Sequence, residues 1–123
     1  MVGASSSPER PSNGVFARLL AAGYRVVPVN PKESSVHGQR AYASLSDVPG
    51  PVDIVDVFRR PEHTPEVAEQ AVAIGAKVLW LQSGIWNEAA AARATAGGLR
   101  VVMDECIGVA HSRLRIGHRQ AEP

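Results

Sequence analysis

The segment VVPVNPK, residues 26–32, gives the strongest indication of the fold of this chain. Its valine-rich part, residues 26–29, has the continuous hydrophobicity of a strand that is buried on both faces of a parallel sheet. The pair Asn30-Pro31 ends this strand, and Lys32 follows directly. Ligands of open α/β sheets bind at the carboxyl ends of the strands. A lysine at this place therefore indicates a site for a phosphate group.

Short apolar runs alternate with helical patterns along the rest of the chain. The sequence predicts helices at residues 11–22, 61–74 and 86–96, and strands at residues 2–4, 25–29, 53–58, 77–81 and 100–103. Most of these strands are continuous apolar runs, as a sheet covered by helices on both faces requires. We therefore expect an α/β fold, namely a Rossmann-like three-layer sandwich of about five parallel strands with helices on both faces.

Local signals predict where some of these elements begin and end. Ser12 and Asn13 are expected to cap the first helix, and Gly23 is expected to end it. Residues 30–50 are expected to form a long, irregular connection that contains one helical turn. Residues 104–116 show no clear pattern.

Length and composition limit the class of protein. A chain of 123 residues with 45% hydrophobic residues is expected to form one domain over residues 1–123. One cysteine, Cys106, fits a reducing compartment, and no stretch has the length of a membrane span or the pattern of a signal peptide. We therefore expect a cytoplasmic protein without a membrane partner, in which Cys106 is a small, unreactive hydrophobic residue.

The charge balance gives no reason to expect binding to nucleic acid. The net charge is +1, and only the C-terminal segment is locally basic, with Arg113, Arg115, His118 and Arg119. Such a segment is usually a solvated tail. A homodimer is compatible with a domain of this size, although the sequence carries no interface signature.

The first of four strand-to-helix junctions is rich in small residues. It contains Gly3, Ser5, Ser6 and Ser7, which let backbone amides approach a phosphate ahead of the positive end of a helix. It does not match the GxGxxG fingerprint of dinucleotide sites. An ordinary serine-rich turn is the alternative interpretation.

The second junction, Asn30-Pro31-Lys32, has no acidic residue of the kind that binds the ribose of NAD. A cation there suits a ribose that carries a phosphate, as in NADP or in the 3′-phosphate of coenzyme A. The alternative is that Lys32 is a solvated turn lysine.

The third and fourth junctions add two arginines and a glycine turn. Two adjacent arginines after a strand suit an anion, although they could instead pair with Glu62, Asp56 or Glu66. The glycine turn permits a ligand to approach closely, or it is only a helix entry. These junctions consist of Phe58, Arg59, Arg60 and Pro61, and of Gln82, Ser83, Gly84 and Ile85.

Catalytic and metal-binding patterns are missing from the sequence. The four histidines have no metal-ligand spacing, and there is no GxSxG elbow and no GKS or GKT phosphate loop. Trp80 and Trp86 are interpreted as packing residues. We therefore expect no catalytic residues, no metal and no enzymatic turnover.

Several of these segments together resemble the small stand-alone coenzyme A-binding domain proteins. They are PSNGVFARLLAAGYRVVPVNPK, PVDIVDVFRRPE, AVAIGAKVLWLQSGI and GLRVVMDECI, and the resemblance runs from Val2 to about Leu114. That family is similar in turn to the CoA-binding domain of the succinyl-CoA synthetase α subunit. The order of NPK, FRRP and the turn at residues 82–85 is fairly specific in combination.

The resemblance implies a Rossmann-like fold in which CoA lies across the carboxyl ends of the strands. It assigns Gly3 and Ser5 to Ser7 to the pyrophosphate loop. Residues 29–32, which are Val29, Asn30, Pro31 and Lys32, would flank the adenine and the phosphorylated ribose. Residues 58–61 and 82–85 would border the rest of the cofactor.

Two departures from the family pattern limit what the resemblance implies. Family members have further residues ahead of VGAS, so Met1 falls where the first strand should already be under way, and we expect a short first strand from a native or a truncated start. Near the end, Glu105, Gly108 and Ala110-His111 replace the expected basic residue and Lys-Glu-His pattern. Any function of those side chains should be weakened here.

The expected function is that of a non-catalytic carrier or sensor that binds coenzyme A or an acyl-CoA. The resemblance implies binding without catalysis because the synthetases also need a phosphorylated histidine and a nucleotide-grasp domain, which this chain has no room for. A small NADP-dependent oxidoreductase and a ligand-free interaction domain are the alternatives.

Overall fold

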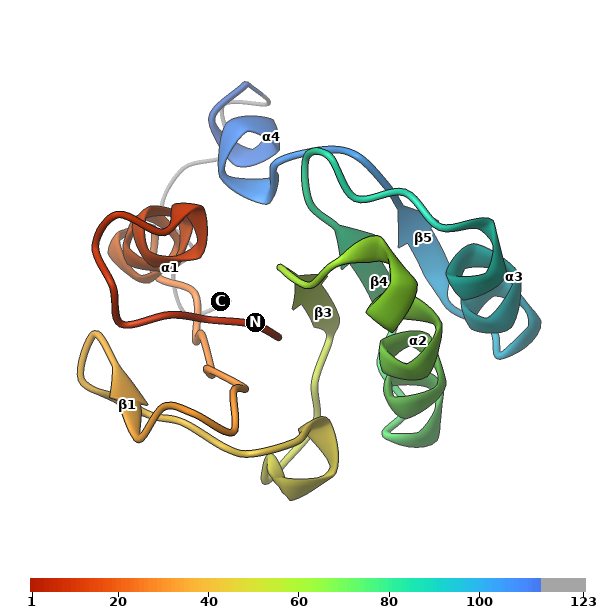
Figure 1. Cartoon of the computed structure of the whole chain (residues 1–123), viewed down its shortest axis with the longest axis horizontal. Coiled ribbons are helices and arrows are strands. Elements are labelled where there is room, and N and C mark those ends of the chain that lie inside the picture. The colour runs from red at the N-terminus through yellow and green to blue at the C-terminus, as the bar shows by residue number, and fades with distance from the viewer. Residues whose placement is uncertain (114–123) are drawn as a thin grey trace, which may run out of the picture.

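The computed structural model of the chain describes the backbone of residues 1–113 and the side chains of residues 1–110 (Figure 1). Arg115, His118 and Arg119 of the basic C-terminal segment lie outside the described residues, as does the side chain of Arg113. The elements in chain order are α1 (Pro11–Ala21), β1 (Ser35–Val36), β2 (Gln39–Arg40), η1 (Leu45–Asp47), β3 (Ile54–Val57), η2 (Pro61–His63), α2 (Thr64–Ala73), β4 (Val78–Leu81), α3 (Glu88–Ala96), β5 (Arg100–Val102) and α4 (Ile107–Arg113).

A parallel sheet of three strands, in the order β3-β4-β5, forms the centre of the fold. Val55 pairs with Leu79, and Leu79 pairs with Val101. On the other edge of β3, Val2 forms parallel bridges to Val57 and to Val29. The predicted α/β fold with a parallel sheet is confirmed, and it is consistent with a Rossmann-like arrangement.

Two of the five predicted strands contribute only bridges to this sheet. Residues 2–4 pair through Val2 alone, and the run at residues 25–29 pairs through Val29. Pro28 has no N–H to donate to a ladder.

Helices α2 and α3 pack against each other and cover one face of the sheet (Figure 1). Their contact is built from small residues, because Ala68 and Ala71 of α2 and Ala90 and Ala94 of α3 are fully buried. Helices α1 and α4 contact each other beside β3. A second cluster of buried residues gathers around α1, namely Met1, Ala4, Val15, Phe16, Leu19, Val26 and Val36.

The predicted end of α1 is confirmed, whereas its predicted cap is wrong. Gly23 has a φ of 93°, and the N–H of Tyr24 donates to the carbonyl of Leu19, which closes the helix. The N-cap is Arg10, without a side-chain cap, because Pro11 starts the helix with its fixed φ. Ser12 and Asn13 are buried instead.

The connection at residues 30–50 is more regular than the sequence predicts. The helical turn is confirmed as η1, but β1 and β2 form a short antiparallel hairpin ahead of it. Its turn residues His37 and Gly38 both have positive φ, 48° and 77°, as two-residue hairpin turns require. The unclear region after residue 104 contains α4. None of the helices in residues 1–113 is long and apolar enough to cross a membrane.

Candidate functional site

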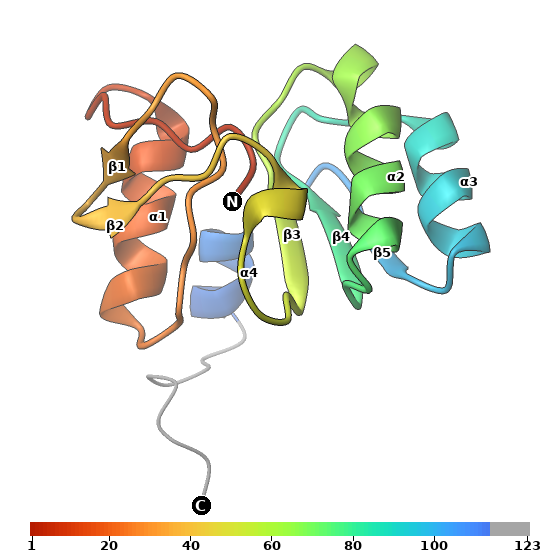
Figure 2. The same ribbon diagram turned by 90° about the horizontal axis from the view of Figure 1, so that it is seen from below.

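The loops that follow β3 and β4, together with residues 3–10, lie along one side of the molecule, at the top of Figure 2. We call this side the carboxyl edge and define it by the four junctions at residues 3–7, 30–32, 58–61 and 82–85. Direct contacts join the first three junctions. The N–H of Gly3 donates to the carbonyl of Val29 at 2.9 Å, and the side-chain amide of Asn30 donates to the carbonyl of Ala4 at 2.9 Å.

Gly3 is required where the first junction meets the third. Its φ is +84°, a conformation that side-chain-bearing residues rarely adopt. A Cβ at this position would collide with the carbonyl oxygen of Phe58 and would lie 3.4 Å from Cδ of Arg59. The backbone of the first loop therefore runs directly beside Phe58 and Arg59.

The side chain of Asn30 shapes the second junction. Its Oδ1 accepts the N–H of Lys32 at 2.9 Å, while its Nδ2 donates to the first loop. This Asx turn fixes the backbone that carries Lys32. Both polar atoms of Asn30 are therefore engaged in positioning the loop, and Lys32 and Pro31 are exposed.

Three cations at the carboxyl edge have no carboxylate partner in the described part of the chain. Lys32, Arg59 and Arg60 are exposed, and the ion pairs among residues 1–110 are Lys77 with Asp53 and Arg93 with Glu69. The alternative in which the arginines pair with nearby carboxylates is therefore not found there. An anion that binds at this edge would meet positive charge that no protein carboxylate already neutralises.

The serine loop already holds one anionic group. The N–H of Ser6 donates to Oε2 of Glu33 at 2.8 Å, and this hydrogen bond lowers the pKa of Glu33. The N–H of Ser7 donates to Oγ of Ser5 at 3.1 Å. Loop amides of this kind bind phosphate oxygens, so Glu33 competes for a group that a phosphate would use. The sequence analysis missed this role of Glu33.

The fourth junction joins the edge through its backbone and not through the side chain of Gln82. That side chain is 2% exposed, and it donates to Oδ1 of Asp56 and accepts the N–H of Ile107 at 3.3 Å. Ser83 and Gly84 are exposed, with Gly84 at a φ of +82° and its N–H donating to Asp104 at 2.6 Å.

The buried members of the predicted site belong to the core. Val29 is 5% exposed and Ile85 is 9% exposed. They fix the loops that follow them but present little surface to a ligand.

Trp86 is a further residue at this edge that the sequence analysis missed. It follows the fourth junction and is 56% exposed, so its predicted packing role is wrong. A single exposed aromatic side chain is common on protein surfaces, but the indole face can stack against the flat base of a ligand. Trp80, in contrast, is half-buried, and its indole N–H donates to the carbonyl of Glu105 at 2.7 Å.

The described residues offer no metal centre. Among them, no group of three or more histidine, cysteine, aspartate or glutamate residues is placed to hold a metal ion. Cys106 is a free, half-buried thiol. The carboxyl edge therefore offers loop amides, three cations and an exposed indole, which together suit a phosphate-bearing ligand with an aromatic base.

Comparison with known proteins gives one family and several relatives. Residues 1–112 match the family described as a CoA binding domain. An uncharacterized protein of Bacillus subtilis (strain 168), YneT, is 44% identical over 112 residues, which are 91% of this chain and 83% of that protein. A solved structure of a hypothetical protein from Pyrococcus horikoshii OT3 has a TM-score of 0.91 at 44% identity, over 93% of this chain and 80% of that chain.

A larger relative places a similar sequence inside an enzyme subunit. The α subunit of the ADP-forming acetate–CoA ligase II of Pyrococcus furiosus is 24% identical over 127 residues. The match covers 94% of this chain but only 28% of the ligase subunit.

Proposed function

This chain belongs to the CoA binding domain family, and we propose that it binds coenzyme A or an acyl-CoA at the carboxyl edge. The observation that supports the proposal is that Lys32, Arg59 and Arg60 are exposed on the two junctions whose backbones contact residues 3–4, without a carboxylate partner among the described residues. CoA has three phosphate groups, which suit the cations of this edge, and an adenine, which is a flat base that suits the exposed indole.

The parts of the cofactor are assigned to the junctions as follows. Ser5, Ser6 and Ser7 bind the pyrophosphate through backbone amides, at the positive end of α1. Residues 29–32 flank the adenine and the phosphorylated ribose, with Lys32 against the 3′-phosphate. Residues 58–61 and the exposed backbone at residues 83–84 border the remainder. This assignment assumes that the segments at Val2 and Val29 act as two further strands of the sheet. The sheet would then have five strands and helices on both faces, as in a Rossmann-like three-layer fold.

We further propose that the protein is a carrier or sensor and not an enzyme. The relative from B. subtilis matches over 83% of its length, so it is a small protein of similar extent. In the ligase subunit most of the chain lies outside the match. The residues of the carboxyl edge offer phosphate and base contacts but no nucleophile with an adjacent base.

Calorimetry with CoA, dephospho-CoA and NADP tests the proposal. If Lys32 binds the 3′-phosphate, dephospho-CoA should bind at least about 10-fold more weakly than CoA, since one charge-assisted contact is worth roughly 1.5–3 kcal/mol. Equal affinities would overturn the assignment of Lys32. Tighter binding of NADP than of CoA would favour an oxidoreductase, and the absence of binding to any of the three would favour a ligand-free interaction domain.

A further inference from the structure

An exposed tryptophan follows the fourth junction of the carboxyl edge, and its backbone is fixed on both sides. Trp86 is 56% exposed, although it directly follows the buried Ile85. The carbonyl of Ile85 accepts the N–H of Asp104 at 3.1 Å. On the other side, Asn87 is the N-cap of α3, and its Nδ2 donates to the carbonyl of Pro61 at 2.9 Å. The indole therefore lies beside the third and fourth junctions without being part of the core.

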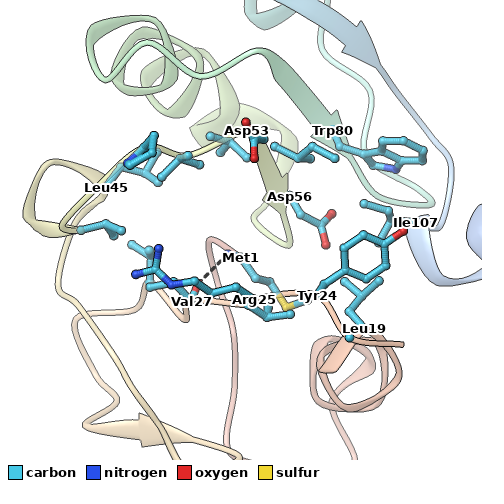
Figure 3. Close-up of a pocket in the computed structure, with 18 of the residues that line it drawn as sticks. Met1, Leu19, Tyr24, Arg25, Val27, Leu45, Asp53, Asp56, Trp80 and Ile107 are labelled. Atoms are coloured by element: carbon cyan, nitrogen blue, oxygen red, sulfur yellow. Dashed lines mark hydrogen bonds between the residues drawn. The ribbon is translucent and has the colours of Figure 1, made fainter. Parts of the chain in front are cut away.

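The other tryptophan shows how this fold accommodates an indole that packs within the protein. Trp80 is half-buried and lines a pocket between residues 25–29 and β3 (Figure 3). Its indole N–H donates to the carbonyl of Glu105 at 2.7 Å. The indole N–H of Trp86, in contrast, has no hydrogen-bond partner among the described residues. Both the ring and the donor of Trp86 are therefore available to a ligand.

The order of the strands places Trp86 on the far side of the edge from Lys32. Four residues at the strand ends are successive partners across the sheet, in the order Val29, Val2, Val57 and Leu81. Neighbouring strands lie about 4.8 Å apart, so the chain that leads to Lys32 and the chain that leads to Trp86 leave the sheet about 14 Å apart. The serine loop follows Val2 and lies between them.

An exposed indole suits an adenine as well as an apolar group, and the order of the junctions favours the second. The adenine and the 3′-phosphate of CoA are carried by the same ribose, so a 3′-phosphate at Lys32 keeps the adenine on that side of the edge. The pyrophosphate then lies at residues 5–7, and the pantetheine arm continues past the third junction toward Trp86. The indole therefore meets the thiol of free CoA or the acyl group of an acyl-CoA.

The charge around Trp86 is opposite to the charge on the phosphate side of the edge. The charged residues of segments 82–88 and 103–104 are Glu88 and Asp104, and both are exposed. The Oδ1 of Asp104 accepts the N–H of Gly84 at 2.6 Å, so this carboxylate is fixed beside the fourth junction. A carboxylate on the acyl group would meet like charge here. A neutral, apolar acyl group would instead cover the indole.

We propose that Trp86 recognises the acyl group, and that the preferred ligand is an acyl-CoA with a neutral, apolar acyl group. This inference rests on the proposed function, because CoA must bind at the carboxyl edge for its acyl group to reach the indole. An apolar group gains free energy when it covers exposed indole surface, which free CoA leaves in water. Free CoA and dicarboxylic acyl-CoA should therefore bind less tightly.

Stable thioethers of CoA test the class of acyl group. S-methyl-CoA is the reference, while S-(3-methylbutyl)-CoA and S-(2-carboxyethyl)-CoA carry groups of the same shape that differ in charge. Calorimetry should show that the methylbutyl compound binds at least about 5-fold more tightly than S-methyl-CoA, because each buried methylene adds to the affinity. The carboxyethyl compound should bind no more tightly than S-methyl-CoA. Equal affinities of the three compounds would overturn the proposal.

A matched pair of protein variants tests whether the indole causes the preference. Trp86→Ala should abolish the tighter binding of the methylbutyl compound and leave S-methyl-CoA nearly unchanged. Val109→Ala truncates another exposed apolar residue, on α4 outside the four junctions, and should change neither affinity. Both side chains are exposed, so the urea midpoints of the two variants should stay close to that of the original protein. A preference that persists in Trp86→Ala would overturn the proposal.

Asp104→Asn tests the discrimination against a charged acyl group. Asparagine keeps an oxygen that can accept the N–H of Gly84, so the loop should keep its shape. The carboxyethyl compound should bind about 3-fold more tightly to this variant, and the methylbutyl compound should bind as before. Glu69→Gln removes an exposed carboxylate from α2 and should change neither affinity. An equal gain in both variants, or no gain in Asp104→Asn, would overturn the exclusion of dicarboxylic groups.

Adenosine 3′,5′-bisphosphate, measured in competition with S-methyl-CoA, separates the acyl end of the ligand from the adenine end. It lacks the pantetheine arm, so Trp86→Ala should leave its affinity unchanged. Weaker binding to Trp86→Ala would place the adenine at the indole and would overturn the proposal. If Trp86→Ala weakens all the CoA compounds equally, the proposed function stands and this inference fails. If none of the CoA compounds binds the original protein, both fail.

Discussion

The two ends of the sheet carry unpaired charge in opposite ways. At the carboxyl edge, Lys32, Arg59 and Arg60 are exposed, so water screens them and they cost the fold little. Beside β3, away from that edge, Asp56 and the α-ammonium group of Met1 are buried, and both have pKa values moved toward their neutral forms. Substitutions at the carboxyl edge should therefore change binding, whereas the charges of these two buried groups should change folding.

The largest expected effect concerns the close backbone contact between Gly3 and Phe58, which joins two loops of the carboxyl edge. Gly3→Ala should destabilise the protein by about 2–4 kcal/mol, because it combines a strained φ with a collision against the carbonyl of Phe58. Urea unfolding measures the loss. Gly84→Ala is the matched control, since Gly84 has a φ of +82° but no atom within 4 Å of an added Cβ. It should cost only about 1 kcal/mol, and equal losses would contradict the close approach at Gly3.

The second prediction concerns pH and the two buried charged groups. The pKa of Asp56 is raised from 3.8 to about 6, so the stability that its protonated form contributes is lost as the pH rises through this window. The pKa of the Met1 α-ammonium group is lowered from 8.0 to about 6, so stability is regained between pH 6 and pH 8. These two groups together predict a minimum of stability near pH 6.

Asp56→Asn separates these two contributions. The variant should lose the fall in stability between pH 4 and pH 6, which is on the order of 3 kcal/mol, and keep the rise above pH 6. Asp53→Asn, at an exposed carboxylate, is the control and should retain both limbs. Urea midpoints at several pH values measure this. A wild-type curve without a minimum would show that the buried charges do not govern stability.

The third prediction is a binding effect without a stability effect. Lys32→Ala should weaken CoA by about 10-fold and leave dephospho-CoA unchanged, since the lost contact is to the 3′-phosphate. Lys77→Ala removes the same charge from an exposed lysine that pairs with Asp53 away from this edge, and CoA affinity should stay as it is. Calorimetry gives both values, and a similar loss in both variants would indicate only a general effect of charge.

The smallest expected effect is a gain. Glu33→Gln removes the carboxylate that accepts the N–H of Ser6, so CoA should bind about 3-fold more tightly. Glu69→Gln removes one negative charge from α2 and is the control. Unchanged affinity in Glu33→Gln would mean that the pyrophosphate does not use this loop amide.

The parts of the fold that depend on local patterns could be predicted from the sequence. β3, β4 and β5 are short apolar runs separated by helices, and α2 begins at a proline signal and α3 ends at a glycine signal. The hairpin at β1 and β2 was not predicted because its turn, His37-Gly38, lacks the usual Asn-Gly or Asp-Gly pair. The cap of α1 was missed because Pro11 makes a side-chain cap unnecessary.

The candidate site could also be predicted only in part from local sequence patterns. Carboxyl ends of parallel strands meet at one edge, so the sequence correctly predicts that the junctions share it. Which side chains face a ligand depends on remote partners. Asn30 bonds to Ala4, and Gln82 bonds to Asp56 and Ile107, contacts that no local spacing reveals. The individual binding residues remain predictions.

The placement of the two tryptophans gives the protein an optical probe at each end. Trp80 lines a pocket between residues 25–29 and β3, Trp86 is exposed beside the carboxyl edge, and the chain contains no other tryptophan. Phenylalanine at either position therefore leaves an emission signal from one end only. Titration of CoA into the two single-tryptophan proteins would show at which end of the sheet it binds, without any label.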